Sequence, residues 1–261
     1  MSVIIPRSPW PIEFPDVVIH SDLRARNTHP SYVAAKTGDA EAANRLVRDL
    51  LSVERTEWLA RFLAGKRTTL VGVTADEVGG FNAIPDAMAE ILAECLDSEI
   101  AAGTIVHANK VGHTKADGWH RLVTPAVFIG NVVAGAAYVL VDDHVGFGGT
   151  FANLRGFIEG KGGHVLAMTA LTETRDARNI ALHPATLNVL KSKHGRELEQ
   201  FWLAEFGHGI DCLTNIEAGY LCRVESVAAI KARMAQAAEL ARRSGLSPVG
   251  LSAPPIDNPP E

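Results

Sequence analysis

Two adjacent acids followed by a glycine-rich segment are the strongest chemical feature of this sequence. Asp142 and Asp143 follow the apolar run 138–141, and segment 146–150 contains three glycines and a threonine. An uninterrupted apolar run predicts a buried, parallel strand, which we expect to end at the two acids. The apolar residues after the glycines recur at helical spacing. The pattern therefore predicts a strand, a glycine loop and a helix.

A glycine loop that opens a helix is suited to bind phosphate, because backbone N–H groups and the positive end of the helix dipole face the same point. Carboxylates only accept hydrogen bonds, so Asp142 and Asp143 need hydroxyl groups, ammonium groups or a cation as partners. A sugar phosphate meets both requirements. The same acids favour a Mg²⁺ ion that bridges the sugar. Since both lie at a strand end, each is expected to be replaceable without loss of the fold.

Other readings of the glycine segment fit less well. A dinucleotide-binding loop, Gly-x-Gly-x-x-Gly, needs a third glycine where Phe151 stands. A nucleotide-hydrolase phosphate loop needs a lysine before its serine or threonine, and Thr150 follows Gly149 instead. A plain tight turn between strand and helix stays open as an alternative, although a turn alone would not need three glycines.

The Asp-Asp-x-x-x-x-Gly-Gly-Thr motif at 142–150 resembles the phosphoribosyl pyrophosphate loop of type I phosphoribosyltransferases. The resemblance implies that the two acids hold the ribose hydroxyls and that the following segment wraps the 5-phosphate. The residues that it assigns to the 5-phosphate are His144, Val145, Gly146, Phe147, Gly148, Gly149 and Thr150.

The sequence departs from the family pattern inside this loop. His144 stands where an aliphatic residue is usual, and Gly146 and Phe147 stand where small hydroxyl residues are usual. Two side-chain phosphate donors are therefore missing, while the backbone donors remain. If Phe147 has only replaced a hydroxyl residue, Phe147→Thr should tighten phosphate binding.

Two further loops match the family in position. The strand-like run 70–73 leads into a glycine-containing loop, and the resemblance implies that this loop holds the pyrophosphate. The residues in that place are Thr74, Ala75, Asp76 and Glu77. The polar segment 108–121 is long for a compact domain, and such loops are often functional. In the family a mobile basic lid closes over the pyrophosphate, and the orotate branch uses Lys, Arg and His there. The matching types are Lys110, His113, Lys115 and Arg121. An ordinary solvated connection is the alternative for both loops.

Composition sets the broad class. The chain has 261 residues, of which 47% are hydrophobic and 21% charged, with a net charge of -5. These values indicate a soluble globular protein and argue against nucleic acid as the main partner. The three cysteines form no Cys-x-x-Cys pair, and histidines 107, 113 and 120 lack the spacing of zinc ligands. No long apolar run is present, so we expect a cytoplasmic protein without an export signal or membrane partner.

The order of predicted elements gives an α/β protein with an open, mostly parallel sheet flanked by helices, and the resemblance implies the type I phosphoribosyltransferase fold. Residues 1–65 are expected to form an arm and helices that pack on the core, and 66–176 the core itself. Residues 177–246 are expected to form a helical hood or C-terminal extension, and 247–261 a disordered, proline-rich tail.

The resemblance implies a glycosyltransferase of the pentosyl class, acting in nucleotide metabolism as a homodimer with Mg²⁺. It would transfer ribose 5-phosphate from phosphoribosyl pyrophosphate to a nitrogen of a base-like acceptor and release pyrophosphate. The residues implied to be catalytic are Asp142, Asp143, Lys110, His113, Lys115 and Arg121. Two alternatives stay open: a non-catalytic regulator that binds phosphoribosyl pyrophosphate or a nucleotide, and a nucleotide hydrolase with water as the acceptor.

Overall fold

The computed structural model describes residues 6–73, 76–77, 80–101, 103–109, 111 and 117–248. Its centre is a five-stranded sheet in the order β1-β9-β8-β2-β5, in which every neighbouring pair is parallel. The strands of this sheet are β1 (Val18–Ile19), β2 (Thr68–Gly72), β5 (Glu99–Ile100), β8 (Ala137–Val145) and β9 (His164–Glu173). Two antiparallel pairs lie outside it: β3 (Asp76–Glu77) with β4 (Gly80–Phe81), and β6 (Ile105–His107) with β7 (Phe128–Gly130).

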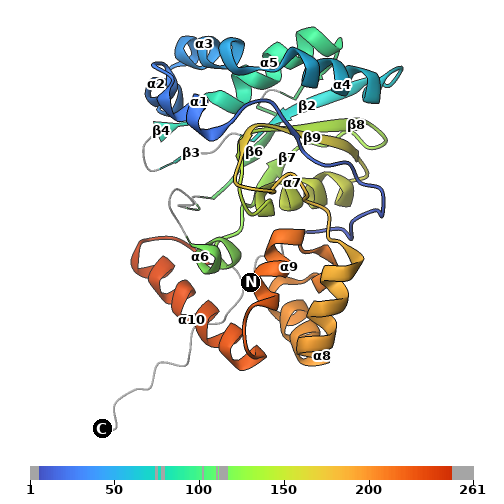
Figure 1. Ribbon diagram of the computed structural model, residues 1–261, viewed down its shortest axis with the longest axis vertical. Helices are drawn as coiled ribbons and strands as arrows, with labels where there is room; N and C mark the ends of the chain where they lie inside the picture. The colour runs from blue at the N-terminus through green and yellow to red at the C-terminus, as the bar shows by residue number, and fades with distance from the viewer. Residues whose placement is uncertain are drawn as a thin grey trace.

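Helices cover both faces of the sheet, as Figure 1 shows. One face carries α1 (Leu23–Thr28), α2 (Tyr32–Lys36), α3 (Ala40–Leu50), α4 (Val53–Leu63) and α5 (Ile84–Leu96). The other face carries α7 (Gly149–Gly160). Alternate residues of β8 serve the two faces, because successive side chains of a strand point to opposite sides. Val139 and Val141 pack under the first group of helices, whereas Tyr138 and Leu140 pack under α7.

A separate apolar core holds the C-terminal helices together, beside the sheet domain in Figure 1. They are α8 (Pro184–Phe206), α9 (Asn215–Cys222) and α10 (Val227–Arg243), and the short α6 (Gly118–Val123) joins them through Leu122 and Val123. Trp202 and Phe206 are buried in this core. The predicted fold class, a mostly parallel sheet flanked by helices with a C-terminal helical extension, is confirmed.

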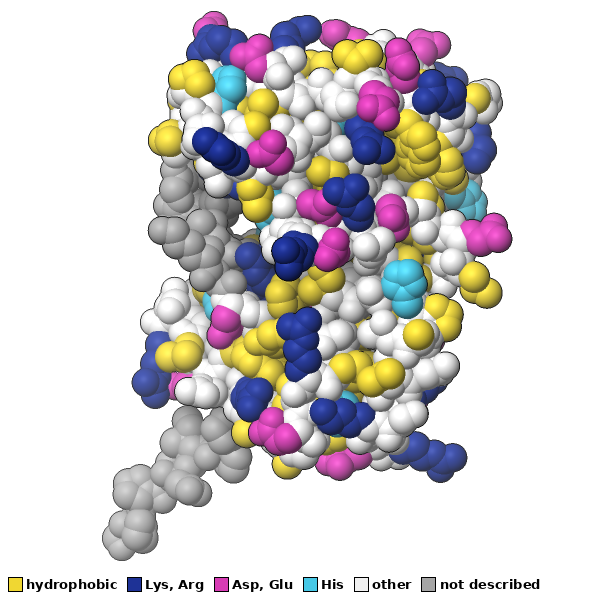
Figure 2. All heavy atoms as spheres, in the orientation of Figure 1, with side chains coloured by type: hydrophobic (Ala, Val, Ile, Leu, Met, Phe, Trp, Pro, Cys, Tyr) yellow, Lys and Arg dark blue, Asp and Glu magenta, His cyan; other side chains and the backbone are white. Residues whose placement is uncertain are grey.

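Local signals placed several elements well. The Asp39 side chain caps α3 by accepting from the Ala42 N–H at 2.9 Å, and Pro85 lies in the first turn of α5, where proline is favoured. No helix within the described residues is long and apolar enough to cross a membrane. Figure 2 shows Lys and Arg side chains interspersed with Asp and Glu side chains over the described part of one face.

Two predicted boundaries were wrong. Strand β8 does not end at Asp142 but continues to Val145, because β9 runs on to Glu173 and keeps pairing with it. The predicted loop 108–121 gives way to helix α6 from Gly118 onward. Asp117 caps this helix by accepting from the His120 N–H at 2.8 Å, a cap that sequence reasoning had not used.

Candidate functional site

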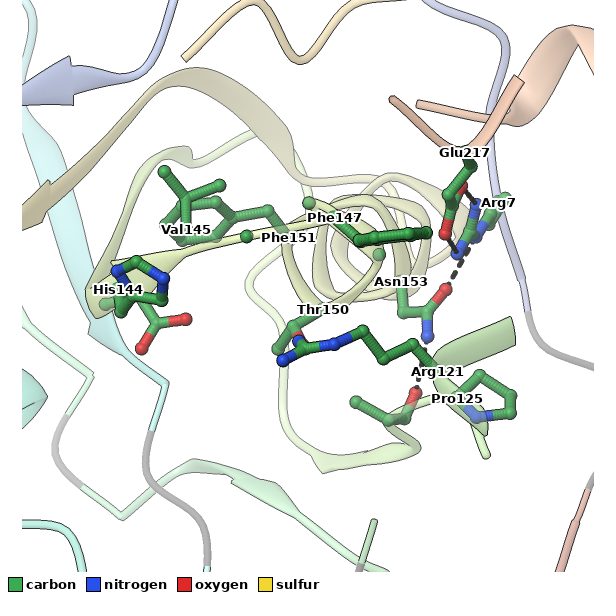
Figure 3. Close-up of a pocket in the computed structure, with 15 residues that line it drawn as sticks. Arg7, Arg121, Pro125, His144, Val145, Phe147, Thr150, Phe151, Asn153 and Glu217 are labelled. Atoms are coloured by element: carbon green, nitrogen blue, oxygen red, sulfur yellow. Dashed lines mark hydrogen bonds and ion pairs between the residues drawn. The ribbon is translucent and has the colours of Figure 1, made fainter. Parts of the chain in front are cut away.

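An open pocket lies where β8 passes into α7 (Figure 3). The space between its walls is about 460 Å³, a figure that includes open solvent. All seven residues that the sequence assigned to a 5-phosphate, from 144 to 150, line this pocket. The other polar side chains that line it are Arg7, Arg121, Asp142, Asn153 and Glu217.

The glycine loop presents backbone donors to the pocket. Gly148 is the N-cap of α7 with a φ of 77°, a left-handed conformation that glycine adopts without strain. Because Gly148 has no side chain, it offers no acceptor to the first N–H groups of α7, and a ligand can accept from them instead. The first N–H groups of any α-helix lack an intrahelical acceptor, and the helix dipole adds positive potential at the same point. This end of α7 is therefore suited to an anion.

Two arginines add cationic groups to the pocket. Arg121 comes from α6, and its guanidinium carbon lies 6.0 Å from the ring centre of Phe147; Figure 3 shows its side chain reaching into the pocket. Burial lowers the pKa of Arg121, but arginine stays protonated in proteins. Arg7 comes from the N-terminal arm. It forms a two-pronged ion pair with Glu217, at 2.6 and 3.0 Å, and its Nε donates to Asn153 Oδ1 at 2.6 Å.

The two acids lie in different surroundings, contrary to the expectation that both sit free at a strand end. Because β8 continues through them, Asp142 lines the pocket, whereas Asp143 points to the opposite face and is only 5% exposed. There the Asp143 carboxylate accepts from Lys36 Nζ at 3.2 Å and from Asn82 Nδ2 at 3.1 Å, and Arg26 Nη1 lies 3.7 Å away. Asp143 is thus an anchor between β8 and the N-terminal helices.

The charge states of the acids differ for the same reason. Burial raises the pKa of Asp142 well above its ordinary value, and the neighbouring Asp143 carboxylate raises it further. Burial also acts to raise the pKa of Asp143, but Lys36 and Arg26 outweigh it, so this pKa is lowered. The surroundings of Asp143 therefore favour its ionised form, whereas those of Asp142 favour its neutral form.

His144 lines the pocket as a neutral side chain. Burial, followed by the charge of Arg26, lowers the pKa of His144 to about 4. Its two ring nitrogens lie 3.0 Å from the Thr172 hydroxyl and 3.1 Å from the Thr174 hydroxyl. The imidazole is therefore held by two residues at the end of β9, and it contributes no positive charge to the pocket near neutral pH.

The remaining predicted site residues have mixed outcomes. Thr74, Ala75, Lys110, His113 and Lys115 lie outside the described residues. Asp76 and Glu77 form the short strand β3, which pairs with β4. Arg121 lies on helix α6, whose Leu122 and Val123 are buried in the C-terminal core, so residues 118–121 are helical where the sequence predicted a loop. The lid role itself stays a prediction.

Sequence reasoning missed three polar residues that line the pocket: Arg7, Asn153 and Glu217. Arg7 and Glu217 are 210 positions apart, and no local pattern links them. The sequence did contain a local signal for Glu217. Thr214-x-x-Glu217 is a capping box, and both of its reciprocal hydrogen bonds form at the start of α9. Asn153, a buried polar residue amid the apolar residues of α7, also indicated a specific partner.

Phe147 has a packing role that explains its departure from the family pattern. Its ring meets that of Tyr220 edge-on with 5.3 Å between centres, and a Cβ atom placed on Gly118 would lie 2.6 Å from the Phe147 ring. We therefore expect Phe147→Thr to lower the free energy of unfolding by about 2 kcal/mol, less than a fully buried Phe would lose. It should also weaken phosphate binding instead of tightening it. Urea denaturation and titration with ribose 5-phosphate measure the two effects, and a variant of unchanged stability would contradict the packing role.

Comparisons with known proteins give relatives of the sequence. No family model matches it. The chain is 41% identical over 246 residues to protein TraN of Escherichia coli, a match that covers 94% of this chain and 54% of that protein. It is 38% identical over 152 residues to an uncharacterized protein of Haemophilus influenzae, covering 58% of this chain and 34% of the relative. The chain thus spans about half the length of the first relative and a smaller share of the second.

Several solved structures with partial likeness are phosphoribosyltransferases. An adenine phosphoribosyltransferase matches with a TM-score of 0.35 and 15% identity, over 52% of this chain and 72% of that chain. A hypoxanthine phosphoribosyltransferase from Staphylococcus aureus matches with 0.36 and 14%, over 59% and 77%. The adenine enzyme of Leishmania tarentolae matches with 0.34 and 16%, over 72% and 88%. All three TM-scores lie below 0.5.

Proposed function

We propose that this chain is a phosphoribosyltransferase that takes ribose 5-phosphate from phosphoribosyl pyrophosphate and joins it to a nitrogen of a base-like acceptor, with release of pyrophosphate. One observation carries the proposal. A single pocket combines the open N-terminus of α7, the cation Arg121 and the carboxylate of Asp142. The first two groups suit a phosphate and the third suits the hydroxyls of the attached sugar.

The chain's own residues have distinct tasks in this reaction. The α7 N-terminus and Arg121 would hold the 5-phosphate, while Asp142 would accept hydrogen bonds from the ribose hydroxyls. Those donors favour the ionised carboxylate and so oppose the effect of burial on the Asp142 pKa. As pyrophosphate leaves, positive charge develops on the sugar, and an ionised Asp142 beside it stabilises that charge. Electrostatic groups of this kind lower the free-energy barrier of a reaction by about 3 kcal/mol.

The pocket fits Mg²⁺ only as a partner of the substrate. Mg²⁺ is usually bound by one or two carboxylates together with substrate phosphates. Asp142 offers one carboxylate, whereas the two oxygens of Asp143 already accept from Lys36 and Asn82. Across the described residues, no group of three or more His, Cys, Asp or Glu side chains could hold a metal ion. When bound, Mg²⁺ would neutralise charge on the diphosphate.

A second candidate has one specific observation in its favour. The burial of Asp143 in an ion cluster leaves one member of the Asp142–Asp143 pair facing the pocket, where the family resemblance implies two. One acid is enough to orient a sugar, so a regulator that binds phosphoribosyl pyrophosphate or a nucleotide without catalysis would use the same pocket. Release of pyrophosphate on addition of phosphoribosyl pyrophosphate, Mg²⁺ and a panel of bases separates the two candidates. The homodimer stays a prediction for either.

Calorimetric titration tests the proposed site directly. Ribose 5-phosphate should bind and ribose should not, because the phosphate supplies most of the contacts. Arg121→Gln should weaken ribose 5-phosphate binding by about 1.5 to 3 kcal/mol, the value of a charge-assisted hydrogen bond. Arg67→Gln is the matched control, since the Arg67 side chain is 85% exposed. Equal affinity of wild type and Arg121→Gln, or no preference for ribose 5-phosphate over ribose, would overturn the assignment.

A further inference from the structure

One face of helix α9 packs against the glycine loop at residues 147–149. Thr214, Glu217 and Tyr220 are three positions apart and so share a side of the helix. The Thr214 hydroxyl donates to the Phe147 carbonyl at 2.6 Å, and the Tyr220 ring packs on the Phe147 ring. A Cβ atom placed on Gly149 would lie 2.7 Å from Glu217 Oε1. Each turn of this face therefore contacts residues 147–149.

The N-terminal arm, the segment before β1, contacts the same region from another side. Arg7 joins Glu217 on α9 to Asn153 on α7, and the side chains of the Arg7–Glu217 pair are only 6% and 3% exposed. Trp10 Nε1 donates to the Leu213 carbonyl at 2.8 Å, just before α9 begins. Figure 1 shows the arm running from β1 down to the C-terminal helices. Two segments from opposite ends of the chain thus meet at one loop.

We propose that α9 and the N-terminal arm form a clasp, joined through Arg7 and Glu217, that holds loop 147–149 in its phosphate-binding conformation. The clasp makes Thr214 and Glu217 positioning residues, which act on the site through loop 147–149. This inference rests on the proposed function in taking a phosphate as the ligand. It gives the C-terminal extension a role at the phosphate end of the site, where the sequence had suggested a hood over the acceptor.

Physical reasons favour such a clasp here. A loop with glycines at 146, 148 and 149 has many conformations to lose when it binds a ligand, and ordering it beforehand removes that cost from the binding step. Arg7 neutralises Glu217 through both carboxylate oxygens, so the acid can sit beside a phosphate site without repelling the ligand. Since a held loop binds better, bound phosphate and a closed clasp must stabilise each other.

Thr214→Val tests the clasp against a merely structural role. It removes the bond to the Phe147 carbonyl and also the cap of α9, because the Thr214 hydroxyl accepts from the Glu217 N–H at 3.1 Å. Ser226→Ala is the matched control: it removes the cap of α10, where Ser226 accepts from the Ala229 N–H at 3.2 Å, without touching the loop. Both variants should lower the melting temperature, Thr214→Val by the larger amount because it also loses the bond to the Phe147 carbonyl. Thr214→Ser keeps the hydroxyl and should behave like wild type.

Two measurements then decide the proposal. Without ligand, amide hydrogen exchange in segment 146–151 should accelerate about tenfold in Thr214→Val and remain unchanged in Ser226→Ala and Thr214→Ser, as one lost hydrogen bond implies. In titration, ribose 5-phosphate should bind Thr214→Val about tenfold more weakly than it binds the other two. Unchanged exchange in Thr214→Val, or equal acceleration in Ser226→Ala, overturns the clasp. If exchange responds as expected but wild type binds no ribose 5-phosphate, the clasp stands and the proposed function fails.

Discussion

Replacement of Asp143 by asparagine is expected to lower the free energy of unfolding by about 3 to 5 kcal/mol, the usual cost of removing one partner of a buried ion pair. The Asp143 side chain is 8% exposed, as is that of Arg26, and Lys36 is the third charged member of the cluster. An amide has the same shape as the carboxylate but carries no charge, so the buried Arg26 would lose its compensating anion. Urea denaturation monitored by circular dichroism measures the change.

Asp142→Asn is the matched control, because the substitution is the same and the residue is the neighbour in the same strand. Burial raises the pKa of Asp142, so the folded protein already disfavours its charge. The variant should therefore change the free energy of unfolding by less than about 1 kcal/mol or stabilise the fold slightly. It should lose affinity for ribose 5-phosphate, since Asp142 lines the pocket. Equal stability losses in the two variants would show that Asp143 is no special anchor.

The difference between the two acids shows where sequence reasoning stopped. The apolar run before them predicted the first part of β8 correctly, but hydrophobicity does not mark the end of a strand in which three polar residues, 142–144, follow the apolar run. Had the strand been extended to Val145, the two-residue alternation would have placed Asp142 and Asp143 on opposite faces. The partners of Asp143 were beyond prediction in any case, because Lys36 lies 107 positions away.

Distance along the chain also separates the part of the site that the sequence predicted from the part that it missed. The glycine loop and α7 follow one another in the chain, so spacing was enough to predict them. The elements that support the loop come from opposite ends of the sequence: Arg7 from a proline-rich arm and Thr214 from a helical extension. The sequence alone indicated that Phe147 replaces a hydroxyl residue of a phosphate loop. Its packing partner, Tyr220, lies far along the chain and no local pattern links the two.

Gly156→Ala should destabilise the protein, although a glycine-to-alanine change inside a helix usually stabilises it. In an unobstructed helix interior this change stabilises by about 0.5 to 1 kcal/mol. Here, a Cβ atom on Gly156 would lie 2.2 Å from the Pro6 carbonyl oxygen and 2.5 Å from the Arg7 Cα, and both are backbone atoms of the arm. The arm must move away from α7, and Arg7 moves with it. Separation of Arg7 from the buried Glu217 then costs on the order of 3 kcal/mol.

Gly219→Ala in α9 is the control for this substitution, since a Cβ atom there would meet nothing within 4 Å. It should leave the arm in place and raise the free energy of unfolding by the ordinary helix propensity. Limited trypsin digestion with mass spectrometry reports on the arm: cleavage after Arg7 should be fast in Gly156→Ala and slow in Gly219→Ala and wild type, whose Arg7 side chain is 6% exposed. Because the displaced arm no longer braces Glu217 against loop 147–149, Gly156→Ala should also bind ribose 5-phosphate more weakly. A stabilised Gly156→Ala variant with a protected Arg7 would mean that the arm can yield without losing its ion pair, and that the close approach of arm and helix is not what holds Arg7 in the pocket.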